Sequence, residues 1–180
     1  MAKAMTGTFT ISQTVEYSTA GNYVTASIPI GSLIDVGDAQ ALEVESVDYI
    51  WQAYKTTTDE FSPVGLSFPI TGAGSWGAQL MDRNAATMLS ASDNNLISSA
   101  AITQDAGGVL SHSSDFFPDD FQRNSGRFVV NDEMYIVAKL NAGAFATSMK
   151  LRLAVRVRAK VVKLATRDWM AISLETVQNE

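Results

Sequence analysis

The 180-residue sequence contains no cysteine and only one histidine, His112. The absence of cysteine excludes disulfides, thiolate metal sites and cysteine nucleophiles, so the fold has to rest on packing alone. A single imidazole leaves little scope for general acid-base chemistry, and we therefore expect neither an enzyme nor a bound cofactor.

Charged residues and long apolar runs are also scarce. Charged residues form 18% of the chain and apolar residues 46%, a composition too hydrophobic for a disordered protein. A helix needs about 18 consecutive apolar residues to span a bilayer, and no uninterrupted apolar run in the sequence is close to that length, so we expect no membrane span. The length suits one domain over residues 1–180, and no internal repeat or linker divides the chain.

Two segments near the start show the period-two alternation of half-buried strands. Apolar and polar residues alternate from Phe9 to Tyr17 and again from Val24 to Ile30. The Ala-Gly-Asn turn signal at 20–22 between them predicts a hairpin over residues 8–30. Pro29 cannot donate a backbone hydrogen bond, which indicates that the second strand lies near a sheet edge.

Further strands are expected in the middle and at the end of the chain. In residues 40–54 the apolar parity changes near Ser46, which predicts a β-bulge or a bend. Residues 56–127 are rich in turn formers and predict long loops with short strands and a helical turn at 85–89. Strands are predicted at 128–130, 134–140 and 149–164, whereas the last dozen residues fit a helix or a strand. The pattern favours an all-β fold, an antiparallel β-sandwich of the jelly-roll type.

The long strand near the end is the most unusual segment. Seven of the 13 cations lie between residues 150 and 167, although the formal net charge of the chain is -6. One face of the strand carries the basic residues Lys150, Arg152, Arg156, Arg158 and Lys160. These cations could pair with acidic neighbours such as Glu43 and Glu45, contact nucleic-acid phosphates, or bind an anionic ligand or lipid head group.

A glycine string and a doubled aromatic are candidate contact loops. Gly72, Gly74 and Gly77 match the spacing of a dinucleotide fingerprint, but Trp76 would hinder approach to a pyrophosphate and no alternating β-α pattern follows. We interpret this stretch as a glycine loop with an aromatic tip. The pair Phe116 and Phe117 lies in a Ser/Asp-rich loop, where an interface and burial under the loop itself are both consistent with the sequence.

The loop around His112 offers weak candidates for chemistry. Its serine and aspartate neighbours are too close in sequence to form a nucleophile, base and orienter set, so we interpret it as a solvated loop. Asp115, Asp119 and Asp120 are candidate calcium ligands, but their spacing is not that of a dedicated calcium loop. An acidic loop facing basic partner residues is the simpler interpretation.

The small size, low charge, lack of cysteine, alternating strands, long polar loops and late basic strand resemble the single jelly-roll capsid proteins of icosahedral viruses. The resemblance implies a virion protein that assembles with copies of itself, either alone or together with other capsid proteins, with the basic strand facing the genome or a neighbouring subunit. One rival is a phage tail, spike or decoration subunit. Another is a carbohydrate-binding β-sandwich that uses Trp51, Tyr54 and Trp76 as stacking platforms.

Overall fold

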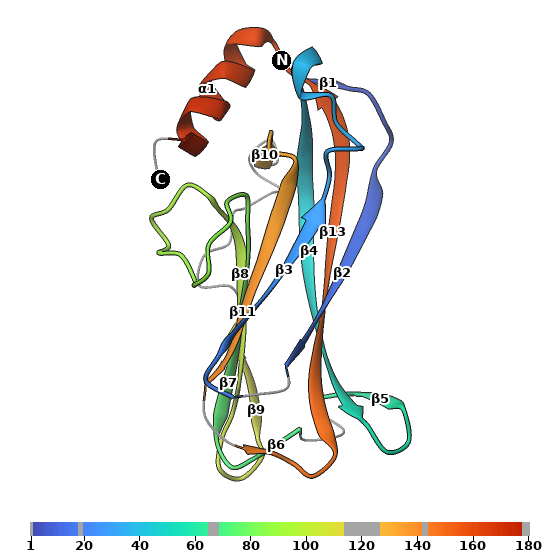
Figure 1. The fold of residues 1–180 in the computed structure, drawn as a ribbon, viewed down its shortest axis with the longest axis vertical. Helices are drawn as coiled ribbons and strands as arrows, with labels where there is room; N and C mark the ends of the chain where they lie inside the picture. Colours follow the sequence, from blue (N-terminus) through green and yellow to red (C-terminus); the bar gives the residue numbers. More distant parts are fainter. Residues whose placement is uncertain (1, 18–19, 65–68, 114–126, 142–143, 178–180) are drawn as a thin grey trace.

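The computed structural model describes residues 2–17, 20–64, 69–113, 127–141 and 144–177. Two antiparallel sheets pack face to face as a sandwich (Figure 1). Sheet A contains β1 (Lys3–Ala4), β2 (Phe9–Tyr17), β4 (Gln40–Lys55), β5 (Glu60–Pro63), β10 (Arg127–Val129) and β13 (Met149–Lys163). Sheet B contains β3 (Tyr23–Pro29), β7 (Gly74–Met81), β8 (Leu96–Gln104), β9 (Leu110–Ser113) and β11 (Glu133–Asn141).

The order of the strands is that of a jelly roll. In sheet A, β13 lies between β4 on one side and β2 with β1 on the other, and β4 pairs at its far edge with β10 and β5. Sheet B has the order β3-β11-β7-β8-β9. The chain crosses repeatedly between the sheets, so strands that are neighbours in a sheet are mostly distant in sequence. The predicted all-β, antiparallel, jelly-roll fold class is confirmed.

The remaining elements are short. A two-stranded sheet joins β6 (Ile70–Thr71) to β12 (Ala144–Phe145), and η1 (Val36–Asp38) is a single 3₁₀ turn. The C-terminal segment, which fits a helix or a strand in sequence, is a helix, α1 (Thr166–Val177). Trp169 and Ile172 of α1 pack against a small apolar cluster that lies apart from the main core, so burial selects the helical alternative.

The alternation seen in the sequence explains the core. Every second side chain of a strand points into the space between the sheets, and the apolar members meet there. The largest fully buried side chains include Tyr17, Leu42, Trp76, Leu80, Met134, Ile136, Leu140 and Leu151. The Tyr17 hydroxyl of sheet A donates a hydrogen bond to the Gly77 carbonyl of sheet B at 3.2 Å, which links the two layers across the core.

The predicted hairpin over residues 8–30 is wrong, although both of its strands exist. β2 pairs with β13 in sheet A, whereas β3 pairs with β11 in sheet B. The turn between them therefore carries the chain from one sheet to the other. β3 is an edge strand of sheet B, as Pro29 indicated.

The predicted β-bulge is confirmed. The register between β4 and β13 shifts where Arg158 faces Ser46 and Ala159 faces Val44, which leaves Glu45 as the extra residue. The bulge explains why the apolar parity of the sequence changes at this point, because one inserted residue turns the following side chains to the opposite face.

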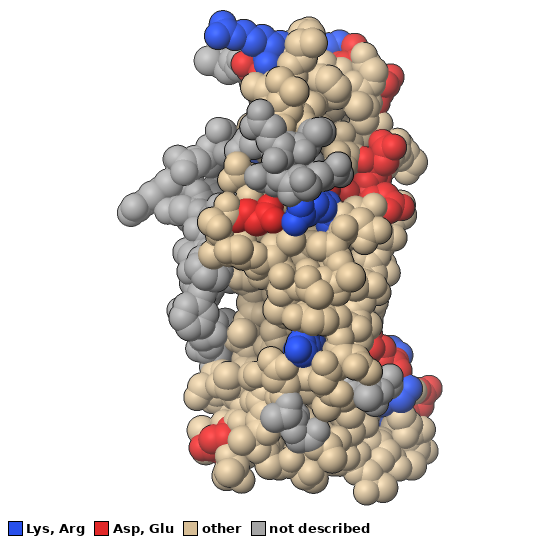
Figure 2. Space-filling model, turned by 60° about the vertical axis from the view of Figure 1, so that its left-hand side comes forward, with Lys and Arg blue, Asp and Glu red and all other residues tan. Residues whose placement is uncertain are grey.

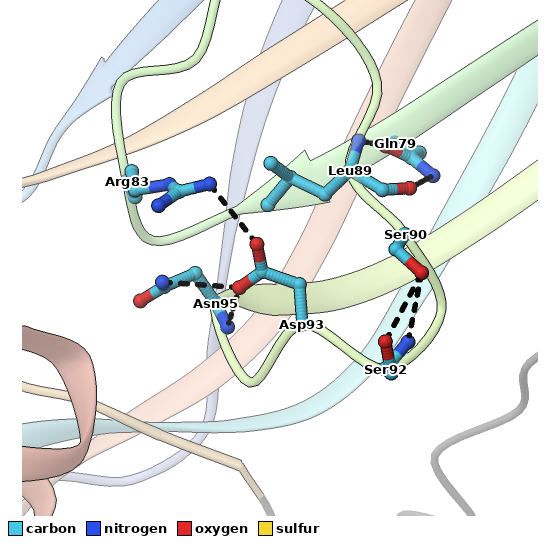
Figure 3. A network of polar contacts seen from close by, with 7 residues as sticks. All are labelled: Gln79, Arg83, Leu89, Ser90, Ser92, Asp93 and Asn95. Atoms are coloured by element: carbon cyan, nitrogen blue, oxygen red, sulfur yellow. Dashed lines mark hydrogen bonds and ion pairs between the residues drawn. The ribbon is translucent and has the colours of Figure 1, made fainter. Parts of the chain in front are cut away.

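The helical turn predicted at 85–89 is wrong. Residues 82–95 form a loop that returns to the strands of sheet B, and the Gln79 side chain of β7 holds its backbone. Gln79 accepts a hydrogen bond from the Leu89 amide at 2.7 Å and donates one to the Leu89 carbonyl at 3.1 Å (Figure 3). An ion pair of 3.0 Å between Arg83 and Asp93 closes the loop, so side-chain contacts replace the expected helical hydrogen bonds.

Candidate functional site

The candidate site is the outer surface of β13, where five cations alternate with buried apolar residues. We call this surface the basic face, and it consists of Lys150, Arg152, Arg156, Arg158 and Lys160. The side chains of β13 that point to the opposite, inner face, including Leu151, Leu153, Val155 and Val157, are 0% exposed. Because β13 is an interior strand of sheet A, the cations run along the middle of the sheet, with β2 on one side and β4 on the other.

At the end near β5, two cations of the basic face pair with Glu16 of β2. The Lys150 ammonium lies 2.6 Å from one carboxylate oxygen of Glu16, and the Arg152 guanidinium lies 2.9 Å from the other. The hydrogen bonds from Lys150 and then Arg152 lower the pKa of Glu16. Arg152 also stacks over the rings of Tyr54 and Phe61, at 4.9 and 4.8 Å from their centroids. Both cations at this end are therefore held within the sheet.

At the end near β1, Lys160 lies between two carboxylates of β4. Its ammonium is 3.3 Å from Glu43 and 3.1 Å from Glu45, the two acidic neighbours named from the sequence. The hydrogen bond to Glu45 is the main cause that raises the pKa of Lys160, and the same bond lowers the pKa of Glu45. This end carries two acids for one base.

The middle of the basic face is different. Arg156 and Arg158 are exposed, and neither makes an ion pair or hydrogen bond with any residue that the structure describes. In the sheet register Arg156 lies between Ser12 and Asp48, and Arg158 lies between Thr10 and Ser46. The two arginines are thus surrounded mainly by small hydroxyl side chains.

The outer side of sheet B is less charged. Figure 2 brings the side of the molecule with β8 and β11 forward and shows a broad uncharged area with isolated charged patches. On β3 the exposed side chains are neutral, and Lys139 of β11 lies over the Tyr23 ring at 4.6 Å from its centroid. The two outer surfaces of the sandwich therefore differ in chemistry.

The glycine string does not form the expected aromatic-tipped loop. Gly72 occupies a turn at φ 83°, but Gly74 begins strand β7 and Gly77 lies inside it. Trp76 lies between them in the strand, and its side chain is 0% exposed, so it belongs to the core and cannot act as a surface contact. The strands around the string are antiparallel, unlike those of a dinucleotide-binding unit.

Burial also removes most of the predicted sugar-stacking platforms. The Trp51 side chain is 8% exposed and that of Trp76 is fully buried, so neither ring offers a free face to a sugar. Tyr54 lies on the outer side of sheet A, where its ring packs against Phe61 at a centroid distance of 4.7 Å. Sequence reasoning could not separate these aromatics, because core and surface aromatics have the same local pattern.

Several other candidates fall in or beside a segment that the structure leaves undescribed. The predicted interface pair Phe116 and Phe117, and the candidate calcium ligands Asp115, Asp119 and Asp120, lie outside the described residues. His112 lies in β9, and its backbone is paired with that of Ile102 of β8. It therefore sits in a strand and not in the solvated loop expected from its neighbours.

A buried polar cluster around Asp82 was missed in the sequence. Asp82 is 3% exposed at the end of β7, and its Oδ2 atom lies 3.6 Å from the Arg127 guanidinium. Its backbone donates to the Asn95 carbonyl at 3.0 Å and accepts a hydrogen bond from the Asn131 side chain. Burial, opposed by Arg127, raises the pKa of Asp82 to about 6. In sequence these polar residues look like ordinary turn residues, so no local signal marks them as buried.

The cavities offer little chemistry. A cavity of about 390 Å³ lies between η1, the end of β13 and the start of α1, and its charged residues Asp38 and Lys163 pair with each other. A smaller one of about 180 Å³ lies beside Met88 on β7 and β8. In the described part of the chain no group of three or more His, Cys, Asp or Glu side chains is placed to hold a metal ion. None of the described helices is long and apolar enough to cross a membrane.

Strand order and sheet packing define a jelly-roll β-sandwich. No protein-family model matches the chain, and no curated protein matches it in sequence. Among solved structures it is similar to VP1 of Trichodysplasia spinulosa-associated polyomavirus in complex with sialylated precision glycooligomers. That match has a TM-score of 0.50 and 11% identity, and covers 90% of this chain and 98% of that chain.

Two further VP1 structures are similar. Merkel cell polyomavirus VP1 in complex with 3'-sialyllactosamine matches with a TM-score of 0.49 and 8% identity, covering 91% of this chain and 98% of that one. Apo chimpanzee polyomavirus VP1 matches with a TM-score of 0.47 and 10% identity, covering 91% and 99%. VP1 is a single jelly-roll capsid protein, so the resemblance named from the sequence is confirmed at the level of the fold.

Proposed function

We propose that this chain is a structural capsid subunit of a virus, and that copies of it assemble into a closed icosahedral shell. The observation that supports the proposal is the jelly-roll fold, which is similar to that of a polyomavirus capsid protein over 90% of this chain and 98% of that one. In this proposal residues 1–180 act as one domain, and the protein is located in the virion.

The surfaces suit a protein that meets many neighbours. A low content of charge leaves broad neutral areas, such as the one in Figure 2, that can be covered by other subunits without burying unpaired charges. Closed symmetry repeats each contact many times, so modest individual contacts suffice for a stable assembly. We propose that the turn around Gly72 and Gly74, at the end of the sandwich near β6, contributes such contacts, and that the residues Phe116 and Phe117 do so as well.

The experiment is a measurement of assembly mass. The purified protein is studied by light scattering and negative-stain imaging over a series of protein and salt concentrations. Closed particles of uniform size would support the proposal. A small fixed oligomer such as a trimer would favour a tail, spike or decoration subunit instead. A monodisperse monomer under every condition would overturn the proposal of a self-sufficient shell protein.

A further inference from the structure

The cations of the basic face are not equivalent. Three of the five are engaged inside sheet A: Lys150 and Arg152 with Glu16, and Lys160 with Glu43 and Glu45. The first group has one positive charge more than its acids, and the second has one negative charge more. The two ends therefore offset each other, and the positive excess of this surface lies in the middle, where Arg156 and Arg158 outnumber the one acid Asp48.

Arg156 and Arg158 are two residues apart on one strand and point to the same side. At a rise of about 3.3 Å per residue their Cα atoms are about 7 Å apart, so the two guanidinium groups can contact separate anionic groups. Asp48 is the acidic residue registered beside them, and it makes no ion pair with Arg156 in the described structure. The charge of Arg158 contributes to the lowered pKa of Glu45, but neither arginine is held by a hydrogen bond or ion pair to a described residue, so both guanidinium groups can reach an external partner.

A row of hydroxyl groups runs beside the arginines. On β2 the exposed residues Thr10 and Ser12 are registered with Arg158 and Arg156, and Thr14 continues the row beside Ala154. Arginines together with Ser and Thr hydroxyls are the usual donors to phosphate oxygens in protein–nucleic acid complexes. A protein-protein contact centre, in contrast, is usually built on large apolar or aromatic anchors. Next to this strip, Ile50 is the one large apolar side chain of β4 counted as exposed, at 38%.

We propose that the middle of the basic face, formed by Arg156 and Arg158 with the hydroxyls of Thr10 and Ser12, binds the phosphate backbone of nucleic acid without sequence specificity. The inference extends the proposed capsid function, because it assigns this side of the sandwich to the packaged genome. The outer face of sheet A carries one more cation than acids, since its five cations stand against Glu16, Glu43, Glu45 and Asp48. The chain as a whole has a net charge of -6, so the other surfaces are more negative and nucleic acid is attracted to this one.

The test is a binding measurement with a fluorescein-labelled 30-nucleotide single-stranded DNA and the corresponding duplex, followed by anisotropy. For the duplex, two phosphate contacts per subunit correspond to a slope of about -1.8 in log K against log salt, or about twelvefold weaker binding at 200 mM than at 50 mM salt. For the single strand the slope is about -1.4, or about sevenfold weaker binding. The double variant Arg156→Gln/Arg158→Gln is expected to bind at least tenfold more weakly at 50 mM salt.

A charge-matched control removes two cations elsewhere: Lys139→Gln on the outer side of sheet B and Arg167→Gln on α1. The control is expected to bind like the unchanged protein. Equal loss in both variants would mean that net charge alone drives binding, and would overturn the inference. Absence of binding by the unchanged protein at 50 mM salt would overturn it as well.

Assembly is measured in parallel, so that the two proposals can fail separately. Particles that form but bind no oligonucleotide would leave the capsid function and refute the genome contact. If the protein forms no particles but binds DNA in a way that depends on the arginines, the capsid function is refuted and the nucleic-acid site is supported. If the arginine variant keeps its fold by circular dichroism but loses assembly, and the unchanged protein binds no DNA, the arginines contact a neighbouring subunit instead.

Discussion

Replacing Asp82 by asparagine measures what a buried carboxylate costs this fold. The Asp82 side chain is 3% exposed, and its Oδ1 atom has no hydrogen-bond partner among the described residues. Oδ2 lies 3.6 Å from the Arg127 guanidinium, longer than an ordinary hydrogen bond. Burial outweighs the attraction of Arg127 and raises the pKa from 3.8 to about 6. Asparagine keeps the shape and removes the charge.

The magnitude follows from the pKa. A rise from 3.8 to about 6 corresponds to about 3 kcal/mol at 1.36 kcal/mol per unit. The raised pKa means that the folded state binds the proton more tightly than the unfolded state. Asp82 therefore costs nothing when protonated in both states, and its cost grows as the pH rises from about 4 to about 6. Above that range the full penalty applies.

Asp82→Asn is thus expected to raise the free energy of unfolding by about 3 kcal/mol at pH 7.5 and by about half of that at pH 5. Urea unfolding at one fixed protein concentration measures both values. Asp48→Asn, which removes an exposed carboxylate from sheet A, serves as the control and is expected to change stability by less than about 0.5 kcal/mol. An Asp82→Asn protein less stable than the unchanged chain at pH 7.5 would refute the reasoning, because the ion pair with Arg127 would then outweigh desolvation.

Three further substitutions test the packing. Trp76→Ala is expected to lower the free energy of unfolding in urea by about 3–5 kcal/mol, since the ring is fully buried. A loss of assembly at unchanged stability would contradict this, because it would mean that Trp76 is a surface contact residue. Gln79→Ala removes both hydrogen bonds to the Leu89 backbone and is expected to lower the free energy of unfolding by about 1–3 kcal/mol, with faster hydrogen exchange at the Leu89 amide. Unchanged exchange would show that these two hydrogen bonds do not hold the loop. Lys160→Gln should cost less than about 1 kcal/mol by thermal unfolding, because its pairs are partly exposed; a larger loss would contradict this.

Much of sheet A could be predicted from local pattern. β13 alternates between cations and apolar residues, and the basic face and its buried side follow directly from a period of two. The bulge at Glu45 was visible as a change of parity, because an inserted residue leaves a trace in the order of apolar positions. Glu43 and Glu45 were also named correctly as acidic neighbours of the basic face, and Lys160 is the cation that pairs with them.

The failures share one cause, which is that local pattern carries no information on distant partners. β2 and β3 alternate as hairpin strands would, yet their partners are β13 and β11. The stretch 85–89 suggested a helical turn, but its backbone is bound by Gln79, which local propensity cannot reveal. Trp76 was interpreted as a loop tip because glycines surround it, whereas β7 carries it into the core.

The amino-acid order by itself determined the class of the fold, the strand segments at both ends of the chain, and the five cations of the basic face. The tertiary structure decided which of those cations are free. Glu16 lies 134 residues before Lys150 in the chain and reaches it only because β2 and β13 pair in sheet A. Alternation decides which face a side chain occupies, and strand pairing decides which charges lie opposite it. The exposed pair Arg156 and Arg158 is therefore a property of the assembled sheet.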